Sequence, residues 1–314
     1  MHRQAEKNSV ATLSVVSNSS LMLLKLITGA VTGSVSVLSE AIHSAVDLVA
    51  SVIALVAVKS SGKPADETHP YGHGKIENVS GVVEALLIFG AAVWIIAEAV
   101  QKLLHREPLE SIGWGVGIML VSSVVNVIVS EKLFAVGRKS DSSALLADAW
   151  HLRTDVFTSF GVMVGLAVVM VGEAIWPETD LGWVDPVAAI MVACLILKAA
   201  YDLTLFAGKD LLDVRLPAEE EKQITAIVSH TAPGIRGLHK LRTRKAGHTR
   251  YVDLHIQVDP GMTVEAAHRL SHQVANRIRE MFPETITAVH VEPCGTVPAA
   301  PNAESPTERS PSQR

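Results

Sequence analysis

The feature that most constrains the fold is a series of six apolar stretches in the first two-thirds of the 314-residue chain. Each is long enough to cross a bilayer as a helix, which takes about 20 residues. They also contain Gly, Ser and scattered charges, which suit helices packed around a polar pathway better than helices surrounded by lipid. The sequence therefore predicts a membrane-embedded all-α bundle of six transmembrane helices. The expected spans are Val10–Val31, Ser34–Val58, Val79–Leu104, Ile112–Leu133, Ala144–Val171 and Leu181–Ala207.

Basic residues in the connections between the spans predict the orientation of this bundle. Lys and Arg precede the first span and follow the second and fourth, whereas the fifth connection carries only acids. The third connection, with Lys102 and Arg106, reduces this asymmetry. Because positively charged loops stay in the cytoplasm, both termini are predicted to be cytoplasmic. Residues 1–9 are polar and lack the cleavage pattern of a secretory signal, so we expect no targeting peptide.

The last third of the chain has the pattern of a soluble domain. The expected elements are a helix over Pro217–Ala232, strands over Arg236–Lys245 and Arg250–Val258, a helix over Val264–Phe282 and a strand over Ile286–Val291. The order αββαβ predicts a small α+β domain, of ferredoxin-like type, with helices on one face of a sheet. The predicted divisions are an N-terminal segment over 1–9, the bundle over 10–207, the soluble domain over 208–295 and a disordered tail over 296–314.

The second predicted strand alternates between apolar and polar side chains. Such alternation with a period of two indicates that one face is buried and the other is not. We expect Val252, Leu254, Ile256 and Val258 to face the core, and Tyr251, Asp253, His255 and Gln257 to face the other way.

Composition excludes several classes of protein. A net charge of −5 does not suit a nucleic-acid binder, which needs a strongly basic face. The mean hydropathy of +0.31 is too high for an ordinary soluble enzyme of this length. The two cysteines, Cys194 and Cys294, form neither a disulfide framework nor a CxxC metal motif. The 13 histidines carry more information, because several recur at short, regular spacings.

Two His–Asp pairs lie within the predicted spans. The second span holds His43 and Asp47, and the fifth holds His151 and Asp155. An i,i+4 spacing places each pair on one face of its helix, and all four residues fall near mid-depth. Two imidazoles and two carboxylates make a tetrahedral set suited to Zn²⁺. A lone histidine in an apolar helix is commonly a core residue, but a carboxylate at mid-bilayer costs about 2.5–3.5 kcal/mol and needs a reason.

Other polar residues in the spans give weaker indications. Glu40 and Asp148 each precede a histidine of the pairs by three residues. Two roles are open for them, orienting an imidazole or lining a water-filled vestibule. Glu84 and Glu98 are expected to face the protein interior. Asn18 and Lys25 are expected to be structural.

Further candidate ligands lie outside the spans. Asp66, His69 and His73 follow the second span at spacings of three and four, in a segment where Gly and Pro permit a tight turn. In the soluble domain, His290 and Glu292 share one face of the last strand. Together with His239, His255 and His268, these residues are enough to bind one or two metal ions. One interpretation places this site at a subunit interface. The alternative for each is an unrelated surface residue, which is our interpretation of His230, His248 and His272.

These residues together resemble the cation diffusion facilitator family, in particular its bacterial zinc and ferrous-iron efflux branch. The resemblance extends from about Val10 to Cys294. Its most specific elements are HxxxD in spans two and five and DxxHPYGHGKxE in the loop between spans two and three. Further support comes from the segments HKLRTR, at 239–244, and HVEPC, at 290–294.

The resemblance implies a homodimer in a bacterial inner membrane that exports divalent metal from the cytoplasm in exchange for protons. It assigns His43, Asp47, His151 and Asp155 to the transport site. It assigns Asp66, His69 and His73 to a loop site, and His239, His255, His268, His290 and Glu292 to a site in a cytoplasmic metal-binding and dimerisation domain. It also implies that Lys75 and Asp213 form a charge interlock holding the helix bundles.

The sequence departs from the family pattern in three places. Members of the iron and zinc branch often have Asp where His43 stands, so the ligand set looks more like that of dedicated zinc exporters. Glu292 stands where Asp is usual. The segment 137–143 is short and lacks the His-rich insertion of many eukaryotic relatives, which favours a bacterial source.

Zn²⁺ is the expected cargo, with Fe²⁺, Co²⁺, Cd²⁺ and Mn²⁺ left open because imidazole and carboxylate ligands do not exclude them. Three other classes remain as alternatives. A membrane metalloenzyme is disfavoured because the chain has no HExxH and four protein ligands leave no open coordination position. A metal sensor that does not transport and a channel that does not couple metal to protons are separated from a transporter only by measuring flux.

Overall fold

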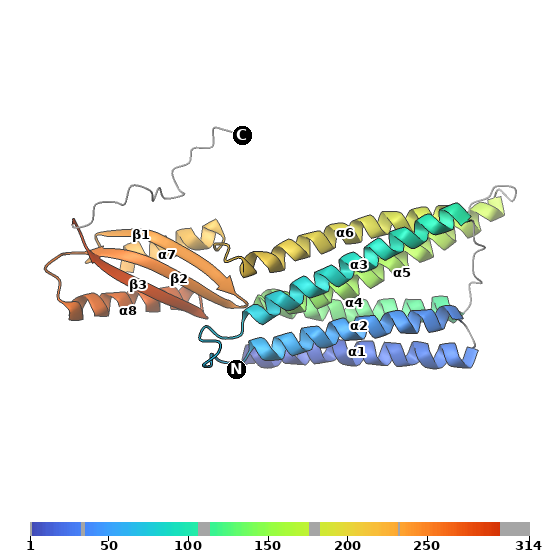
Figure 1. The fold of residues 1–314 in the computed structure, drawn as a ribbon, viewed down its shortest axis with the longest axis horizontal. Coiled ribbons are helices and arrows are strands. Elements are labelled where there is room, and N and C mark those ends of the chain that lie inside the picture. The colour runs from blue at the N-terminus through green and yellow to red at the C-terminus, as the bar shows by residue number, and fades with distance from the viewer. Residues whose placement is uncertain (1, 33–34, 106–113, 176–182, 232, 296–314) are drawn as a thin grey trace, which may run out of the picture. The chain divides into compact units, whose positions relative to one another are not determined.

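The computed structural model describes residues 2–32, 35–105, 114–175, 183–231 and 233–295. The chain divides into two compact units, Met1–Leu211 and Leu212–Arg314. The first unit consists of helices that run side by side (Figure 1), and the second combines helices with a sheet. The predicted disordered tail over 296–314 lies outside the described residues.

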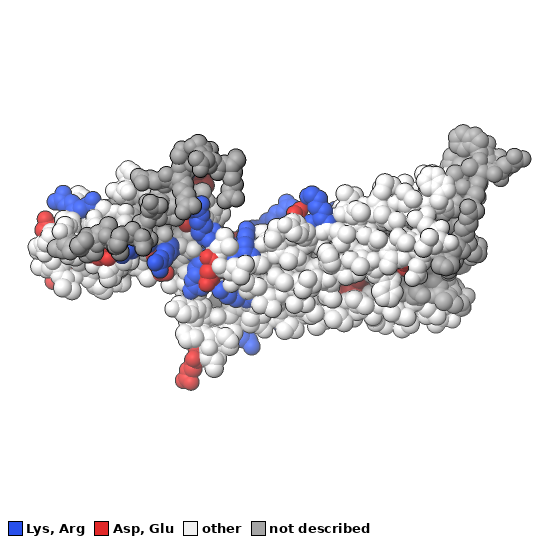
Figure 2. Space-filling model, turned by 45° about the horizontal axis from the view of Figure 1, so that its top comes forward, with Lys and Arg blue, Asp and Glu red and all other residues white. Residues whose placement is uncertain are grey.

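Six long helices form the first unit. They are α1 (His2–Thr32), α2 (Val35–Ser61), α3 (Lys75–His105), α4 (Trp114–Ser140), α5 (Ser143–Ile175) and α6 (Val184–Leu211). In the described residues, α1, α2, α3, α4 and α6 are long and apolar enough to cross a membrane. The remaining predicted span lies on α5, whose first half carries Asp148, Arg153 and Asp155. On the face shown in Figure 2, most of the surface of this unit carries no charge, as expected for contact with lipid.

Small residues let these helices approach closely, as is common between helices in membranes. One buried cluster joins α1, α2, α4 and α5, and a second joins α3, α5 and α6. Helix α5 contributes to both, with Leu145 and Leu152 in the first cluster and Ala147 in the second. Helix α5 is packed on both sides, and its residues Asp148, His151 and Asp155 are directed into the interior of the bundle.

The second unit confirms the predicted αββαβ order. Its elements are α7 (Ala218–Thr231), β1 (Gly237–Ala246), β2 (Thr249–Val258), α8 (Val264–Met281) and β3 (Thr285–Pro293). The sheet has the order β1-β2-β3, with β1 antiparallel and β3 parallel to β2. The helix α8 begins at the N-cap Thr263, whose side chain accepts a hydrogen bond from the N–H of Ala266.

The core of this unit lies between one face of the sheet and the two helices. The predicted inward residues of β2 are buried, and they pack with Ile224 of α7 and with Leu270 and Val274 of α8. Tyr251, expected on the polar face, is also buried at 5 % exposure. The guanidinium of Arg244 lies 4.4 Å from the centre of its ring, a cation–π contact that the alternation of the strand does not reveal.

Candidate metal centres

The structure brings all four predicted membrane ligands together, because α2 and α5 pack against each other. The Nε2 atom of His151 lies 3.2 Å from Oδ1 of Asp47, and Nε2 of His43 lies 3.9 Å from the same oxygen. One ligand atom each from His43, Asp47 and Asp155 lie within 4.8 Å of one another. Ligand atoms around tetrahedral zinc are about 3.3 Å apart, given bonds of roughly 2 Å, so small side-chain rotations would complete such a site.

Three of these ligands, His43, Asp47 and Asp155, line a cavity of about 110 Å³ between α1, α2, α4 and α5. Asp47 and His151 are buried, whereas the His43 side chain is 52 % exposed. Apart from Leu21 and Met119, the lining consists of polar or charged residues, a composition that suits an ion rather than an apolar ligand. The cavity lining comprises Asn18, Leu21, Lys25, His43, Ser44, Asp47, Met119, Ser122, Ser123, Asn126, Asp155, Thr158 and Ser159.

Lys25 therefore belongs to the surroundings of the site, although the sequence suggested only a structural role. Its side chain is 6 % exposed, and its ammonium group donates a hydrogen bond to Oγ of Ser44 at 2.8 Å. Asn18 also lines the cavity, and its amide donates to Oγ of Ser51 at 2.5 Å. The available signal was the charge of Lys25 itself, because ionisable residues within a membrane usually mark an ion pathway.

The remaining membrane acids differ in their surroundings. Asp148 is buried and accepts a hydrogen bond from Ser51 at 3.1 Å, while Nδ1 of His151 is buried without a hydrogen-bond partner among the described residues. Glu84 is buried, as expected, and accepts from Ser80 at 3.0 Å. The prediction for Glu98 was wrong, because its side chain is 54 % exposed and pairs with Lys102 at the outer surface. The side chain of Glu40 lies outside the described part of the structure.

The loop between α2 and α3 gathers the three candidate ligands around Asp66. Its Oδ1 accepts hydrogen bonds from the backbone N–H of His69 at 2.7 Å and from the hydroxyl of Thr68 at 2.9 Å. These bonds, that from His69 foremost, lower the pKa of Asp66 to about 2. Its Oδ2 lies 3.2 Å from Nε2 of His73, and the rings of His69 and His73 are 4.4 Å apart. The loop therefore presents an ionised carboxylate with two imidazoles beside it.

In the second unit the ligands lie side by side across three strands. The strand register pairs His239 of β1 with His255 of β2, and His255 with His290 of β3. Oε1 of Glu292 is hydrogen-bonded to Nδ1 of His255 at 2.7 Å. Oε2 of Glu292 lies 3.0 Å from Nε2 of His239. Nε2 of His290 is 3.6 Å from the same carboxylate. The hydrogen bond with His255 is the main reason that the pKa of Glu292 falls below its ordinary value.

A β-bulge follows His239 and was not anticipated from the sequence. The pairing of β1 with β2 shifts between His239 and Arg242, and Lys240 has a φ of 50°, in the left-handed region. Bulges turn side chains near functional sites, and this one separates His239 from the regular alternation of the rest of β1.

The structure does not bring His268 into this cluster. It lies on α8, where its ring is 4.5 Å from that of His272. The reason is topological, because α8 packs against the core face of the sheet while His255 points to the opposite face.

For the charge interlock, Lys75 is the first residue of α3 and Asp213 lies 3.5 Å from Arg244. Because Lys75 and Asp213 belong to different units, the interlock stays a prediction.

The helical bundle holds a polar cavity lined by candidate metal ligands, and the α+β unit carries a further histidine–carboxylate cluster. These two features define the class of protein as a membrane transporter of cations. The chain belongs to the cation diffusion facilitator family of cation efflux transporters. Residues 11–212 match the family model described as "Cation efflux transmembrane domain", and residues 216–294 match "Cation efflux protein, cytoplasmic domain". The family transports divalent metals, and the resemblance drawn from the motifs is confirmed.

Curated relatives match nearly the whole chain. The cation-efflux pump FieF of Klebsiella pneumoniae is 35 % identical over 282 residues, covering 90 % of this chain and 91 % of the relative. FieF of Citrobacter koseri is 33 % identical over 288 residues, covering 92 % and 93 %. Among solved structures, the metal-bound C-terminal domain of the CzcD transporter from Thermotoga maritima is 26 % identical, covering 26 % of this chain and 93 % of that one, with a TM-score of 0.24.

Proposed function

We propose that this transporter exports Zn²⁺ from the cytoplasm across a bacterial inner membrane in exchange for protons. The observation that carries the proposal is the convergence of His43, Asp47 and Asp155 within 4.8 Å in a polar cavity of the bundle, with His151 at 3.2 Å from Asp47. Two imidazoles and two carboxylates form a set that binds zinc well. Fe²⁺, Co²⁺, Cd²⁺ and Mn²⁺ are the alternatives that the same ligands allow.

Protons and metal compete for this site. An imidazole binds metal only when it is unprotonated, so binding releases protons and protonation expels the metal. His43 and His151 therefore provide the coupling. Metal enters from the cytoplasm, the bundle changes its packing, and protons from the other side replace the metal. A site near the middle of the bundle suits such alternating access. The basic loops described above support cytoplasmic termini.

The second unit provides a separate site that regulates transport. The cluster around Glu292 faces away from the core of its own unit and is open to solvent, with the His290 side chain 64 % exposed. An exposed cluster of this kind binds cytoplasmic metal at equilibrium. We infer that binding favours a homodimer formed through this unit, which matches the family model of the cytoplasmic domain.

The direct test measures metal flux in proteoliposomes under an imposed pH gradient. Zn²⁺ is compared with Fe²⁺, Mn²⁺, Co²⁺ and Cd²⁺. The test variant is Asp155→Ala, and its matched control is Asp202→Ala, which removes an exposed carboxylate of α6. We expect zinc flux to follow the proton gradient, to vanish in Asp155→Ala and to persist in Asp202→Ala. Zinc flux that ignores the gradient would indicate a channel.

A metal sensor is the second candidate, because the exposed cluster of the soluble unit binds metal without needing the bundle. Tight zinc binding at this cluster together with no flux of any metal would favour that function. Flux of another metal with no zinc flux would keep the transport function and correct the cargo.

A further inference from the structure

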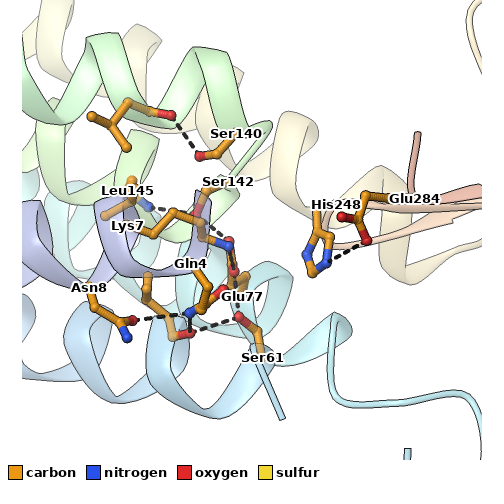
Figure 3. Close-up of polar contacts among 12 residues, drawn as sticks. Gln4, Lys7, Asn8, Ser61, Glu77, Ser140, Ser142, Leu145, His248 and Glu284 are labelled. Carbon is orange, nitrogen blue, oxygen red and sulfur yellow. Dashed lines mark hydrogen bonds and ion pairs between the residues drawn. The ribbon is translucent and has the colours of Figure 1, made fainter. Parts of the chain in front are cut away.

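A buried ion pair closes one end of the helical bundle, away from the metal cavity. Glu77 in the first turn of α3 is fully buried, and its Oε1 accepts hydrogen bonds from the ammonium group of Lys7 and the hydroxyl of Ser61. Its Oε2 accepts from the hydroxyl of Ser142. Figure 3 shows these side chains converging on the one carboxylate. We call Lys7, Ser61, Glu77 and Ser142 the Glu77 network.

The Glu77 network joins four segments that are distant in the sequence. Lys7 belongs to the first turns of α1, and Ser61 is the last residue of α2. Ser142 directly precedes α5, where it also caps the helix by accepting from the N–H of Leu145 at 3.5 Å. Each segment thus holds the others through a single carboxylate, so none of these helix ends separates from α3 without breaking a buried polar contact.

Further contacts at the same end connect α1 with its neighbours. The amide of Gln4 donates to the backbone carbonyl of Val58 on α2 at 2.7 Å. Glu6 on α1 pairs with Lys139 on α4 at 3.0 Å. The end of the bundle that holds the start of α1 is therefore drawn together by polar contacts between helices.

Between the Glu77 network and the metal cavity lies a buried polar layer. Ser14 donates to Ser51 at 3.1 Å, and Ser51 donates to Asp148 at 3.1 Å. Ser14, Ser51 and Asp148 are all fully buried. The cavity itself is lined on α1 by Asn18, Leu21 and Lys25, which lie farther from Lys7 along the helix. Polar contacts thus close the end of the bundle that begins α1, while the cavity lies next to the ligands, on the far side of this polar layer.

The chemistry of the Glu77 network suits a contact that opens and closes. A buried ion pair adds little net stability compared with apolar packing, because both charges lose their hydration. Separation of the helix ends would return Lys7 and Glu77 to water, and hydration would offset the lost contacts. An apolar seal has no such compensation, since opening it exposes apolar surface.

We propose that the Glu77 network is the latch that closes the metal pathway at the end of the bundle holding the start of α1. Its role rests on the alternating access contained in the proposed function, but not on the identity of the metal. Lys7 and Glu77 are positioning residues in this scheme, because neither touches the cargo. With the latch intact the ligands are reached from the opposite end, and with the latch broken they are reached from this end.

The test measures access to both sides of the site in the full-length, metal-free protein. In a background with Cys194→Ala and Cys294→Ala, which removes both native cysteines, single cysteines are introduced by Ser14→Cys on the latch side or by Ser123→Cys in the cavity. Labelling rates with a small thiol reagent are compared with and without Glu77→Gln. The double variant Lys7→Met/Glu77→Gln leaves no unpaired buried charge, and Asp202→Asn on α6 serves as a control outside the latch.

We expect both latch variants to speed labelling of Ser14→Cys roughly tenfold and to slow labelling of Ser123→Cys, because alternating access opens one side as it closes the other. The control should change neither rate. Rates that rise together at both positions would show general loosening and overturn the proposal, as would unchanged rates. If Glu77→Gln does not fold, the double variant decides. If the wild-type protein shows no zinc–proton exchange but the variants show reciprocal labelling, the proposed cargo is wrong and the latch stands.

Discussion

The cluster inside the bundle and the cluster on the sheet use the same ligand types in opposite surroundings. In the bundle, Asp47 and His151 are each 6 % exposed. On the sheet, the His290 side chain is 64 % exposed and that of Glu292 13 %. Charges interact much more strongly in a low-dielectric interior than near water. Protonation therefore changes metal affinity more steeply in the bundle than on the sheet.

This difference separates the two tasks of a metal exporter. A transport site must bind and then release, so its affinity has to change strongly between states. A regulatory site must report concentration, so its affinity has to stay constant while metal exchanges with solvent. Under the proposed function, the buried cluster fits the first task and the exposed strand cluster fits the second.

The largest effect is expected from Asp47→Ala. Asp47 lies near both His43 and His151, so its removal takes away one ligand and the partner of two others. Proton-driven flux should fall to background, while metal binding by the soluble unit stays at the wild-type level. Flux assays combined with calorimetry on the full chain check both parts. Loss of both activities would contradict the independence of the two sites.

Glu292→Ala should have the converse effect, smaller in size. Its carboxylate contacts His239 and His255 and lies near His290, so its removal frees the imidazoles to move apart. We expect metal affinity of the soluble unit to fall roughly 10–100-fold, with flux at saturating metal largely retained. Glu284→Ala, which removes an exposed carboxylate of the same unit, is the matched control. Equal losses in both variants would argue against a specific site.

The sequence predicted most of both clusters, because their ligands follow the periods of the elements that carry them. An i,i+4 pair on a helix and an i,i+2 pair on a strand share a face wherever the element packs. The αββαβ order and the inward face of β2 followed in the same way. His268 did not follow, because its helix covers the other face of the sheet.

The features that the sequence did not reveal depend on contacts between distant segments. Glu77 meets Lys7, Ser61 and Ser142, which have no common spacing. The bulge at Lys240 depends on pairing with β2, and the burial of Tyr251 depends on Arg244 in the neighbouring strand. Periodicity describes one element at a time, so it cannot predict where two elements meet.

The loop site allows a comparison based on pH. The hydrogen bonds that lower the pKa of Asp66 to about 2 keep its carboxylate ionised between pH 7.5 and 5.5. An imidazole binds metal only when it is unprotonated, so we expect loop-site affinity to fall as the pH is lowered over this range. Asp66→Asn should lower affinity by the same factor at both pH values. A factor that changes with pH would show that Asp66 itself gains or loses a proton in this range.

The same reasoning gives the sign of a stability effect in the metal-free protein. A carboxylate whose pKa is lowered by folding stabilises the fold above its ordinary pKa, and the contribution is lost as the pH falls through the lowered value. For Glu292, whose ordinary pKa is 4.5, stabilisation is complete above that pH and declines below it. Thermal unfolding from pH 6 to pH 3 should show a smaller pH slope in Glu292→Gln than in the wild type.

The smallest expected effect comes from Lys25→Met and bears on why the transport site releases its metal. The Lys25 ammonium lines the same cavity as Asp47 and Asp155, and Lys25→Met removes a positive charge that opposes an arriving cation. We expect zinc to bind roughly threefold more tightly and turnover to slow, because release becomes harder. Lys25→Arg keeps the charge and should behave as the wild type in the same flux and binding assays. Weaker binding in Lys25→Met would show instead that Lys25 orders the ligands through Ser44. The difference between the cluster in the bundle and the cluster on the sheet would then depend on proton competition alone.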